Sequence, residues 1–242
     1  MPNPTRELVT RWPGQEHFIP RPWMRTVNKV LAKLRSPFDI KPRFRPELDM
    51  LTYEMVANFE LLLSDVFGHA VPGEIVELGT FTGGTAAVIG SIAKRHGGGK
   101  TFHVYDRFDI QFGKAVDVQK TFIANMEACG VPLPTMHKGD LLDLVPSELP
   151  TTIAFAHIDC GFGGDPKDHA SMVQHCMAGI YPRVPKGGII VLMDYHKPGI
   201  TRLGKDLNPG ARLGGDAFLA DKPERFEALY GGPCSHGFMR KQ

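Results

Sequence analysis

The chain has 242 residues, of which 42% are hydrophobic and 22% charged, an ordinary composition for a globular protein. This length fits one α/β domain with room for an additional segment. No stretch approaches the roughly eighteen apolar residues of a membrane span, and no apolar run follows the basic N-terminus, so we expect neither a membrane anchor nor a secretory signal. The four cysteines are scattered without a C-x-x-C pair, which favours reduced thiols in a cytoplasmic protein.

The charge is concentrated at the N-terminus. Residues 1–46 carry ten Lys or Arg against three Asp or Glu, although the net charge of the whole chain is only +2. This segment is rich in proline, and one short helix is expected around residues 23–34. It lacks the glycine and aromatic pattern of an RNA-binding sheet and the spacing of a zinc finger, so we expect no nucleic-acid partner. We interpret residues 1–46 as a basic arm or lid and residues 47–242 as the folded domain.

Residues 47–67 have apolar side chains at helical spacing, and Gly68 is a suitable helix end. After Val71, short apolar runs alternate with amphipathic stretches. The runs predict strands at 74–78, 101–105, 135–137, 153–158 and 189–193, and the stretches predict helices at 84–95, 114–129 and 168–181. Residues 225–230 and 235–240 flank a glycine-rich turn and predict a closing antiparallel hairpin. This alternation predicts a doubly wound, mostly parallel α/β sheet with helices on both faces.

The strongest local motif is a buried strand that runs into a glycine-rich turn and then a helix, over Val76 to Thr85. Ligands of open α/β sheets bind at the carboxyl ends of the strands, and glycine lets the backbone approach them closely. The turn matches neither the dinucleotide motif nor the phosphate loop, and an acid ends the strand, which suits a cationic ligand such as S-adenosylmethionine. The predicted contacts are Glu77, Gly79, Thr80, Phe81, Thr82, Gly83, Gly84 and Thr85, although an ordinary βα turn would have the same pattern.

Two further acidic residues follow the next predicted strands. Asp106 lies 27 residues after Gly79, where a carboxylate can accept both ribose hydroxyls or, alternatively, cap the following turn. Gly139, Asp140 and Leu141 follow the third strand, where a side chain can contact the adenine. Arg107 and the fourth-strand Asp159 complete the predicted cofactor contacts.

With these acids at the ends of successive strands, the chain resembles the class I S-adenosylmethionine-dependent methyltransferases. More narrowly, from about Leu48 to Lys241 it resembles the macrocin O-methyltransferase family, which methylates sugar hydroxyls of macrolides and related natural products. The landmarks are Val71-Pro72-Gly73-Glu74-Ile75-Val76-Glu77-Leu78-Gly79, Ile158-Asp159, Tyr181-Pro182, Gly187-Gly188, Asp194-Tyr195 and Gly237-Phe238-Met239-Arg240-Lys241. The resemblance implies a Rossmann-like sheet of seven strands, a homo-oligomer, and cofactor binding by Glu77, Gly79 and Asp106.

Two carboxylates, Asp159 and Asp194, end the fourth and fifth predicted strands, and parallel neighbours would bring them together beside the methyl group of the cofactor. Carboxylates suit Mg²⁺, which could hold the acceptor and lower the pKa of its hydroxyl. The resembled family has a second acid before the fifth-strand Asp, and Met193 replaces it here. Three alternatives stay open: Asp165 or Asp168 replaces that ligand, the metal is lost, or both carboxylates only bond to loop amides.

Methyl transfer to an alcohol requires removal of the hydroxyl proton, and histidine is suited to this near neutral pH. His196 follows Asp194 by two residues and is expected to face the cleft, so we predict His196 and Asp194 as the catalytic pair, with Lys197 in reserve. His157 and His169 are weaker candidates. The sequence predicts an O-methyltransferase for a small polyhydroxylated acceptor, first of all a glycosylated natural product. The alternatives are an N-methyltransferase, a cephalosporin-hydroxylase-like enzyme, or a non-catalytic scaffold.

Overall fold

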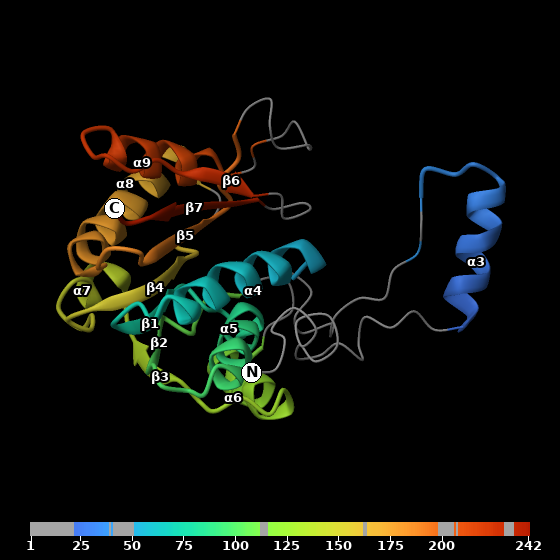
Figure 1. Ribbon diagram of the computed structural model, residues 1–242, viewed down its shortest axis with the longest axis horizontal. Helices are drawn as coiled ribbons and strands as arrows, with labels where there is room; N and C mark the ends of the chain where they lie inside the picture. Colours follow the sequence, from blue (N-terminus) through green and yellow to red (C-terminus); the bar gives the residue numbers. More distant parts are fainter. Residues whose placement is uncertain are drawn as a thin grey trace.

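The computed structural model describes residues 22–38, 40, 51–111, 116–161, 164–197, 206, 208–229 and 235–242. Within this part of the chain, a seven-stranded sheet has the order β3-β2-β1-β4-β5-β7-β6 (Figure 1). The strands are β1 (Glu74–Leu78), β2 (Phe102–Asp106), β3 (Thr135–Lys138), β4 (Ile153–Ile158), β5 (Ile189–Met193), β6 (Glu227–Leu229) and β7 (His236–Arg240). The first five pair in parallel, and β7 pairs antiparallel with both β5 and β6. The predicted doubly wound, mostly parallel sheet and its closing hairpin are confirmed.

Two hydrophobic layers cover the sheet, because successive strand residues point to opposite faces. On one face Ile75 and Phe155 pack against α4 (Tyr53–Gly68), α5 (Gly84–Arg95) and α6 (Val118–Ala128). On the other face Val76 and Ile190 pack against α7 (Leu141–Leu144), α8 (Pro166–Ile180) and α9 (Pro209–Leu219). The same alternation decides which polar residues near the strand ends share a face.

Side-chain caps define where three of the predicted helices begin. Helix α4 starts at Tyr53 instead of residue 47, because the side chain of Thr52 accepts the N–H of Met55. Helix α6 starts after Asp117, which caps it in the same way, and the predicted start at residue 114 lies outside the described residues. Helix α8 starts two residues earlier than predicted, after the cap Asp165.

Helix α9 (Pro209–Leu219) was not among the helices predicted from the sequence. Three glycines lower its helix propensity but allow it to approach its neighbours closely. A Cβ on Gly214 would lie 2.5 Å from the carbonyl oxygen of Ala170 in α8, and one on Gly210 would lie 2.5 Å from His169. Tight packing on α8 therefore outweighs the poor intrinsic propensity of α9.

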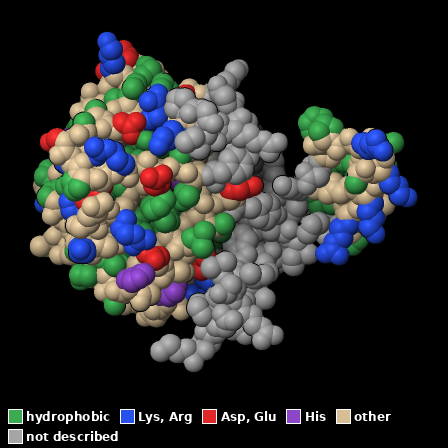
Figure 2. Space-filling view, turned by 45° about the horizontal axis from the view of Figure 1, so that its top comes forward, with side chains coloured by type: hydrophobic (Ala, Val, Ile, Leu, Met, Phe, Trp, Pro, Cys, Tyr) green, Lys and Arg blue, Asp and Glu red, His purple; other side chains and the backbone are tan. Residues whose placement is uncertain are grey.

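Helix α3 (Pro22–Lys33) confirms the short helix expected near the N-terminus. The side-chain amide of Asn28 bonds to both backbone groups of Ile40, which folds the following residues back along the helix. Figure 1 places α3 apart from the α/β body, and Figure 2 shows Lys and Arg side chains gathered on it. The boundary predicted after residue 46 lies outside the described residues and stays a prediction. None of the described helices combines the length and the apolar character of a membrane span.

Candidate functional site

The carboxyl ends of β1, β2 and β4 meet at one edge of the sheet, where backbone hydrogen bonds continue beyond the strands. The N–H of Gly79 donates to the carbonyl oxygen of Tyr105 at 2.8 Å, and the N–H of Asp159 donates to that of Leu78 at 2.8 Å. A Cβ on Gly79 would lie 2.0 Å from the carbonyl oxygen of Asp159. Only glycine fits there, so the first turn lies directly against the fourth strand.

The turn between β1 and α5 has an unusual backbone. Gly79, Phe81 and Gly83 have φ values of 79°, 46° and 85°. The N–H of Gly83 donates to the carbonyl oxygen of Thr80 at 2.9 Å, and a Cβ on Gly83 would lie 2.7 Å from the ring of Phe122. Gly83 caps α5, and Gly84 and Thr85 begin it, so the whole predicted contact segment is one compact turn at a helix N-terminus.

Asp106 braces this turn from the neighbouring strand. Its Oδ2 accepts the N–H groups of Thr80 at 2.7 Å and Phe81 at 2.8 Å, and its Oδ1 accepts the N–H of Phe108 at 2.6 Å. The capping alternative is therefore present in the structure. A carboxylate has about four acceptor positions, so Asp106 retains capacity for a ribose hydroxyl. Ribose binding by Asp106 stays a prediction.

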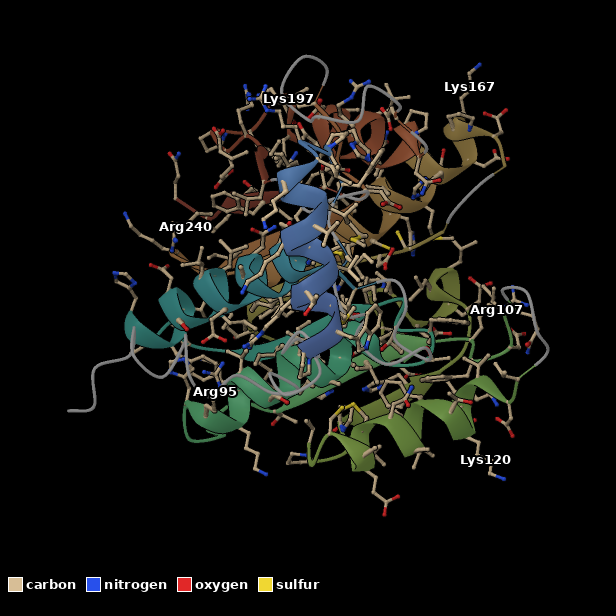
Figure 3. All side chains as sticks on the ribbon, turned by 90° about the vertical axis from the view of Figure 1, so that its right-hand side faces the viewer. Arg95, Arg107, Lys120, Lys167, Lys197 and Arg240 are labelled. Atoms are coloured by element: carbon tan, nitrogen blue, oxygen red, sulfur yellow. The ribbon has the colours of Figure 1, made fainter. Side chains whose placement is uncertain are left out.

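The segment predicted to contact adenine lies at the same edge, after β3. The N–H of Gly139 donates to the carbonyl oxygen of Asp106 at 3.1 Å. The carboxylate of Asp140 accepts the N–H of Leu142 at 2.9 Å and thereby caps α7, which begins at Leu141. Arg107 forms ion pairs with Asp109 at 3.1 Å and with Asp140 at 3.7 Å. Arg107 is largely exposed and lies far from Lys197 in the view of Figure 3.

Glu77 is fully buried below the turn. Its Oε2 accepts the hydroxyl of Thr80 at 2.8 Å, and its Oε1 lies 2.9 Å from Nδ1 of His157 in β4. Both carboxylate oxygens are therefore bonded to side chains of the protein. Direct contact between Glu77 and the cofactor stays a prediction, whereas its support of the turn is a feature of the structure.

Asp159 and Asp194 follow β4 and β5 at this edge, as predicted from the strand pattern. Burial raises the pKa of Asp159 to about 7, and the carboxylates of Asp194, Glu77 and Asp106 contribute in the same direction while His157 opposes them. Asp194 has a φ of 58°, and its Oδ2 accepts the side-chain N–H of Asn208 at 2.5 Å. The edge is therefore acidic and favours a positively charged ligand.

The residues described here do not fit the predicted magnesium site. Over the described part of the chain, no group of three or more His, Cys, Asp or Glu side chains could hold a metal ion. Met193 offers a soft thioether where Mg²⁺ needs a hard oxygen ligand. Asp165 accepts the N–H of Lys167 at 2.8 Å as the cap of α8, and Asp168 is exposed in the first turn of that helix.

The residues predicted as candidate bases, His196, His169 and Lys197, lie in different surroundings. His196 is 5% exposed, directly after Tyr195, whose ring packs on the α8 face of the sheet. Burial lowers the pKa of His169, which bonds to the backbone of Cys160. Lys197 lies at the top of the molecule in the view of Figure 3. The catalytic roles of His196 and Asp194 stay predictions.

His157 is the residue that sequence reasoning undervalued, because it lies within a strand. Parallel pairing places it opposite Glu77, and both side chains are fully buried. The ring of Phe59 from α4 lies edge-on to His157, with 4.9 Å between the ring centroids. A charged residue and a histidine at facing positions of two adjacent predicted strands was the signal that could have revealed this pair.

Residues 76–195 match the family model described as a methyltransferase domain. The O-methyltransferase NovP is similar in structure, with a TM-score of 0.63 and 18% identity over 78% of this chain and 80% of NovP. CalS11, a TDP-rhamnose 3'-O-methyltransferase of calicheamicin biosynthesis, has a TM-score of 0.57 and 20% identity over 92% of this chain and 97% of its own. The S-adenosylhomocysteine-bound methyltransferase PaMTH1 of Podospora anserina has a TM-score of 0.53 and 12% identity over 100% of this chain and 97% of PaMTH1. A search of curated proteins finds no match.

Proposed function

We propose that this chain, in which residues 76–195 match a methyltransferase domain and the sheet has the class I strand order, methylates a hydroxyl group of a small polyhydroxylated acceptor with S-adenosylmethionine. The observation that carries this proposal is the glycine turn after β1, which Asp106 braces and which lies against Asp159. Its backbone can approach a nucleoside closely, and the surrounding carboxylates suit a cation. When bound, the cofactor supplies a methyl group made electrophilic by its sulfonium.

In this proposal each part of the edge has a separate task. The turn from Gly79 to Thr85 and the carboxylate of Asp106 hold the ribose, and Asp140 with its neighbours holds the adenine. The negative charge of Asp159 favours the cationic cofactor over the neutral thioether product. His196 accepts the hydroxyl proton while the new O–C bond forms and the S–C bond breaks, and Asp194 orients the acceptor or the base.

The proposed acceptor is a sugar hydroxyl of a glycosylated natural product. NovP is an O-methyltransferase, and CalS11 acts on the 3'-hydroxyl of TDP-rhamnose, which supports this class of acceptor. The resemblance to the macrocin O-methyltransferase family points in the same direction. The proposal includes a cytoplasmic homo-oligomer with no nucleic-acid or membrane partner, and the exposed apolar side chains of Trp23, Val30 and Leu34 on and just after α3 support an interface.

The first test is calorimetric titration of the purified protein with S-adenosylhomocysteine, with and without Mg²⁺. We expect one-to-one binding, and no binding by a folded protein would end the methyltransferase proposal. A panel of sugar, catechol and amine acceptors then identifies the methylated atom by mass spectrometry and NMR. Methylation only of amines would contradict O-methylation.

His196→Ala tests the proposed base. Loss of a general base reduces kcat by about 10²–10⁴-fold, and the affinity for S-adenosylhomocysteine should change by less than about threefold. Lys197→Ala is measured in parallel, because it removes the neighbouring residue that is the alternative candidate for the base. An unchanged rate of His196→Ala at saturating acceptor would remove His196 from the mechanism.

A further inference from the structure

The buried contact between β1 and β4 reaches the cofactor turn through two side-chain hydrogen bonds. Nδ1 of His157 lies 2.9 Å from one oxygen of Glu77, and the hydroxyl of Thr80 donates to the other oxygen at 2.8 Å. Thr80 is also bonded through its N–H to Asp106 at 2.7 Å. The turn is therefore held from two strands at once, from β2 through Asp106 and from β4 through His157 and Glu77.

The burial of Glu77 makes its partners important. Its side chain is 0% exposed, as is that of His157, so water cannot replace a lost donor. A buried carboxylate that loses a donor is strongly destabilised and reorganises or takes up a proton. Either response would remove the acceptor that fixes the hydroxyl of Thr80. The position of Thr80 thus depends on His157 through the carboxylate of Glu77.

Helix α4 fixes the orientation of the His157 ring. Phe59 lies edge-on to it, with an angle of 87° between the ring planes. The same Phe59 ring lies 4.9 Å from His236 of β7, which is equally buried but bonds to Asn58 at 3.3 Å. Within the described residues, Nε2 of both histidines has no hydrogen-bond partner. Both histidines are therefore buried against Phe59 of α4, but only His157 contacts Glu77.

We propose that His157 is a positioning residue for cofactor binding: through Glu77 and Thr80 it holds the glycine-rich turn in the conformation that receives S-adenosylmethionine. This inference rests on the proposed function. It assigns His157 a role in cofactor affinity and none in proton transfer. It also makes α4, which lies outside the edge itself, part of the support of the cofactor site through Phe59.

Three substitutions separate this role from a purely structural one. His157→Leu removes the donor to Glu77, whereas His157→Asn keeps an N–H near the position of Nδ1. His236→Leu is the matched control, since it removes a buried imidazole from the same cluster without affecting Glu77. For each variant, the dissociation constant for S-adenosylhomocysteine is measured by calorimetry, and KM for the cofactor and kcat are measured once an acceptor is known.

We expect His157→Leu to raise the dissociation constant by about tenfold or more, with kcat at saturating cofactor within about threefold of the wild type. His157→Asn should recover binding to within about threefold, and His236→Leu should stay within about twofold. A dissociation constant of His157→Leu within twofold of the wild type, or equal losses in His157→Leu and His236→Leu, would overturn the inference.

Thr80→Val serves if His157→Leu does not fold, because it breaks the same connection at its other end with little change in volume. We expect a similar loss of affinity, and unchanged affinity of Thr80→Val would overturn the inference independently. The failure of the proposed function and the failure of this inference can be told apart. If the wild type binds no S-adenosylhomocysteine, the proposed function fails and the inference with it; if only the variants bind as the wild type does, the inference alone fails.

Discussion

Individual residues at the carboxyl edge of the sheet adopt backbone conformations that their side chains disfavour. Phe81, Phe108 and Asp194 follow β1, β2 and β5, and their φ values are 46°, 56° and 58°. They are three of the five non-glycine residues with positive φ in the described part of the chain. Each such conformation costs of order 1–3 kcal/mol and persists only where the surroundings impose it. Hydrogen bonds from Phe81 and Phe108 to Asp106 supply part of that constraint.

Asp159 illustrates the cost of an acidic site. Its pKa of about 7 in the folded protein lies above the ordinary value of 3.8, so ionisation disfavours folding, and stability is lost as pH rises through 7. We predict that Asp159→Asn raises the free energy of unfolding at pH 8 by about 2 kcal/mol, less than the full shift implies because Asp159 is only partly buried. The same substitution should lower the affinity for the cofactor. Urea denaturation at pH 8 and pH 5 measures this, and the gain should shrink at pH 5. A variant less stable than the wild type at pH 8 would contradict it.

Contacts between neighbouring helices and strands decide features that no single segment of the sequence reveals. Local patterns predicted β1, β4, β5 and α5 with their observed bounds. The missed helix α9 and the shifted start of α4 show the limit of such patterns. Glycines that oppose a helix in isolation allow α9 to pack on α8, and Thr52 begins α4 by a side-chain bond that apolar spacing does not contain.

A chain of polar side chains connects the first three strands on the face opposite Glu77. His103 bonds to Glu74 through Nε2 and to His137 at 3.1 Å, and His137 bonds to Glu148 at 2.7 Å. His137→Leu removes the central connection, so we predict a loss of about 1–3 kcal/mol in the free energy of unfolding, with the denaturant m-value unchanged.

Urea denaturation of His137→Leu is compared with His69→Leu, a control on a largely exposed histidine that should change stability by less than about 0.5 kcal/mol. Equal effects of the two substitutions would show that the chain of side chains contributes nothing specific. The affinity for S-adenosylhomocysteine should be unchanged in both variants, because neither touches the cofactor turn.

The free energy of unfolding of the domain should depend on pH through His236. Burial lowers its pKa to about 3, and the neighbouring His157 acts in the same direction. The unfolded chain takes up a proton near pH 6.5 and the folded protein does not, so this stability is complete above pH 6.5 and is lost as pH falls toward 3. At pH 4.5 the loss amounts to about 2–3 kcal/mol from this group.

The measurement is the difference in free energy of unfolding between the wild type and His236→Leu at pH 7.5 and pH 4.5. All other titrating groups are common to both proteins, so the difference isolates His236. We expect it to move in favour of the variant by about 2–3 kcal/mol at the lower pH. A difference that is independent of pH would show that His236 is not buried in its neutral form.

Periodicity and turn chemistry act over a few residues, and they are sufficient to predict the strands, most helices, the sheet type and the edge where the acids gather. The positions of Asp106, Asp140, Asp159 and Asp194 at strand ends follow from this alone. Which atoms these residues bond depends on segments that are distant in the sequence. The bonds from Asp106 to the amides of Thr80 and Phe81, and the pairing of Glu77 with His157 80 residues away, were decided only by tertiary packing, because strand register and burial set these side-chain contacts.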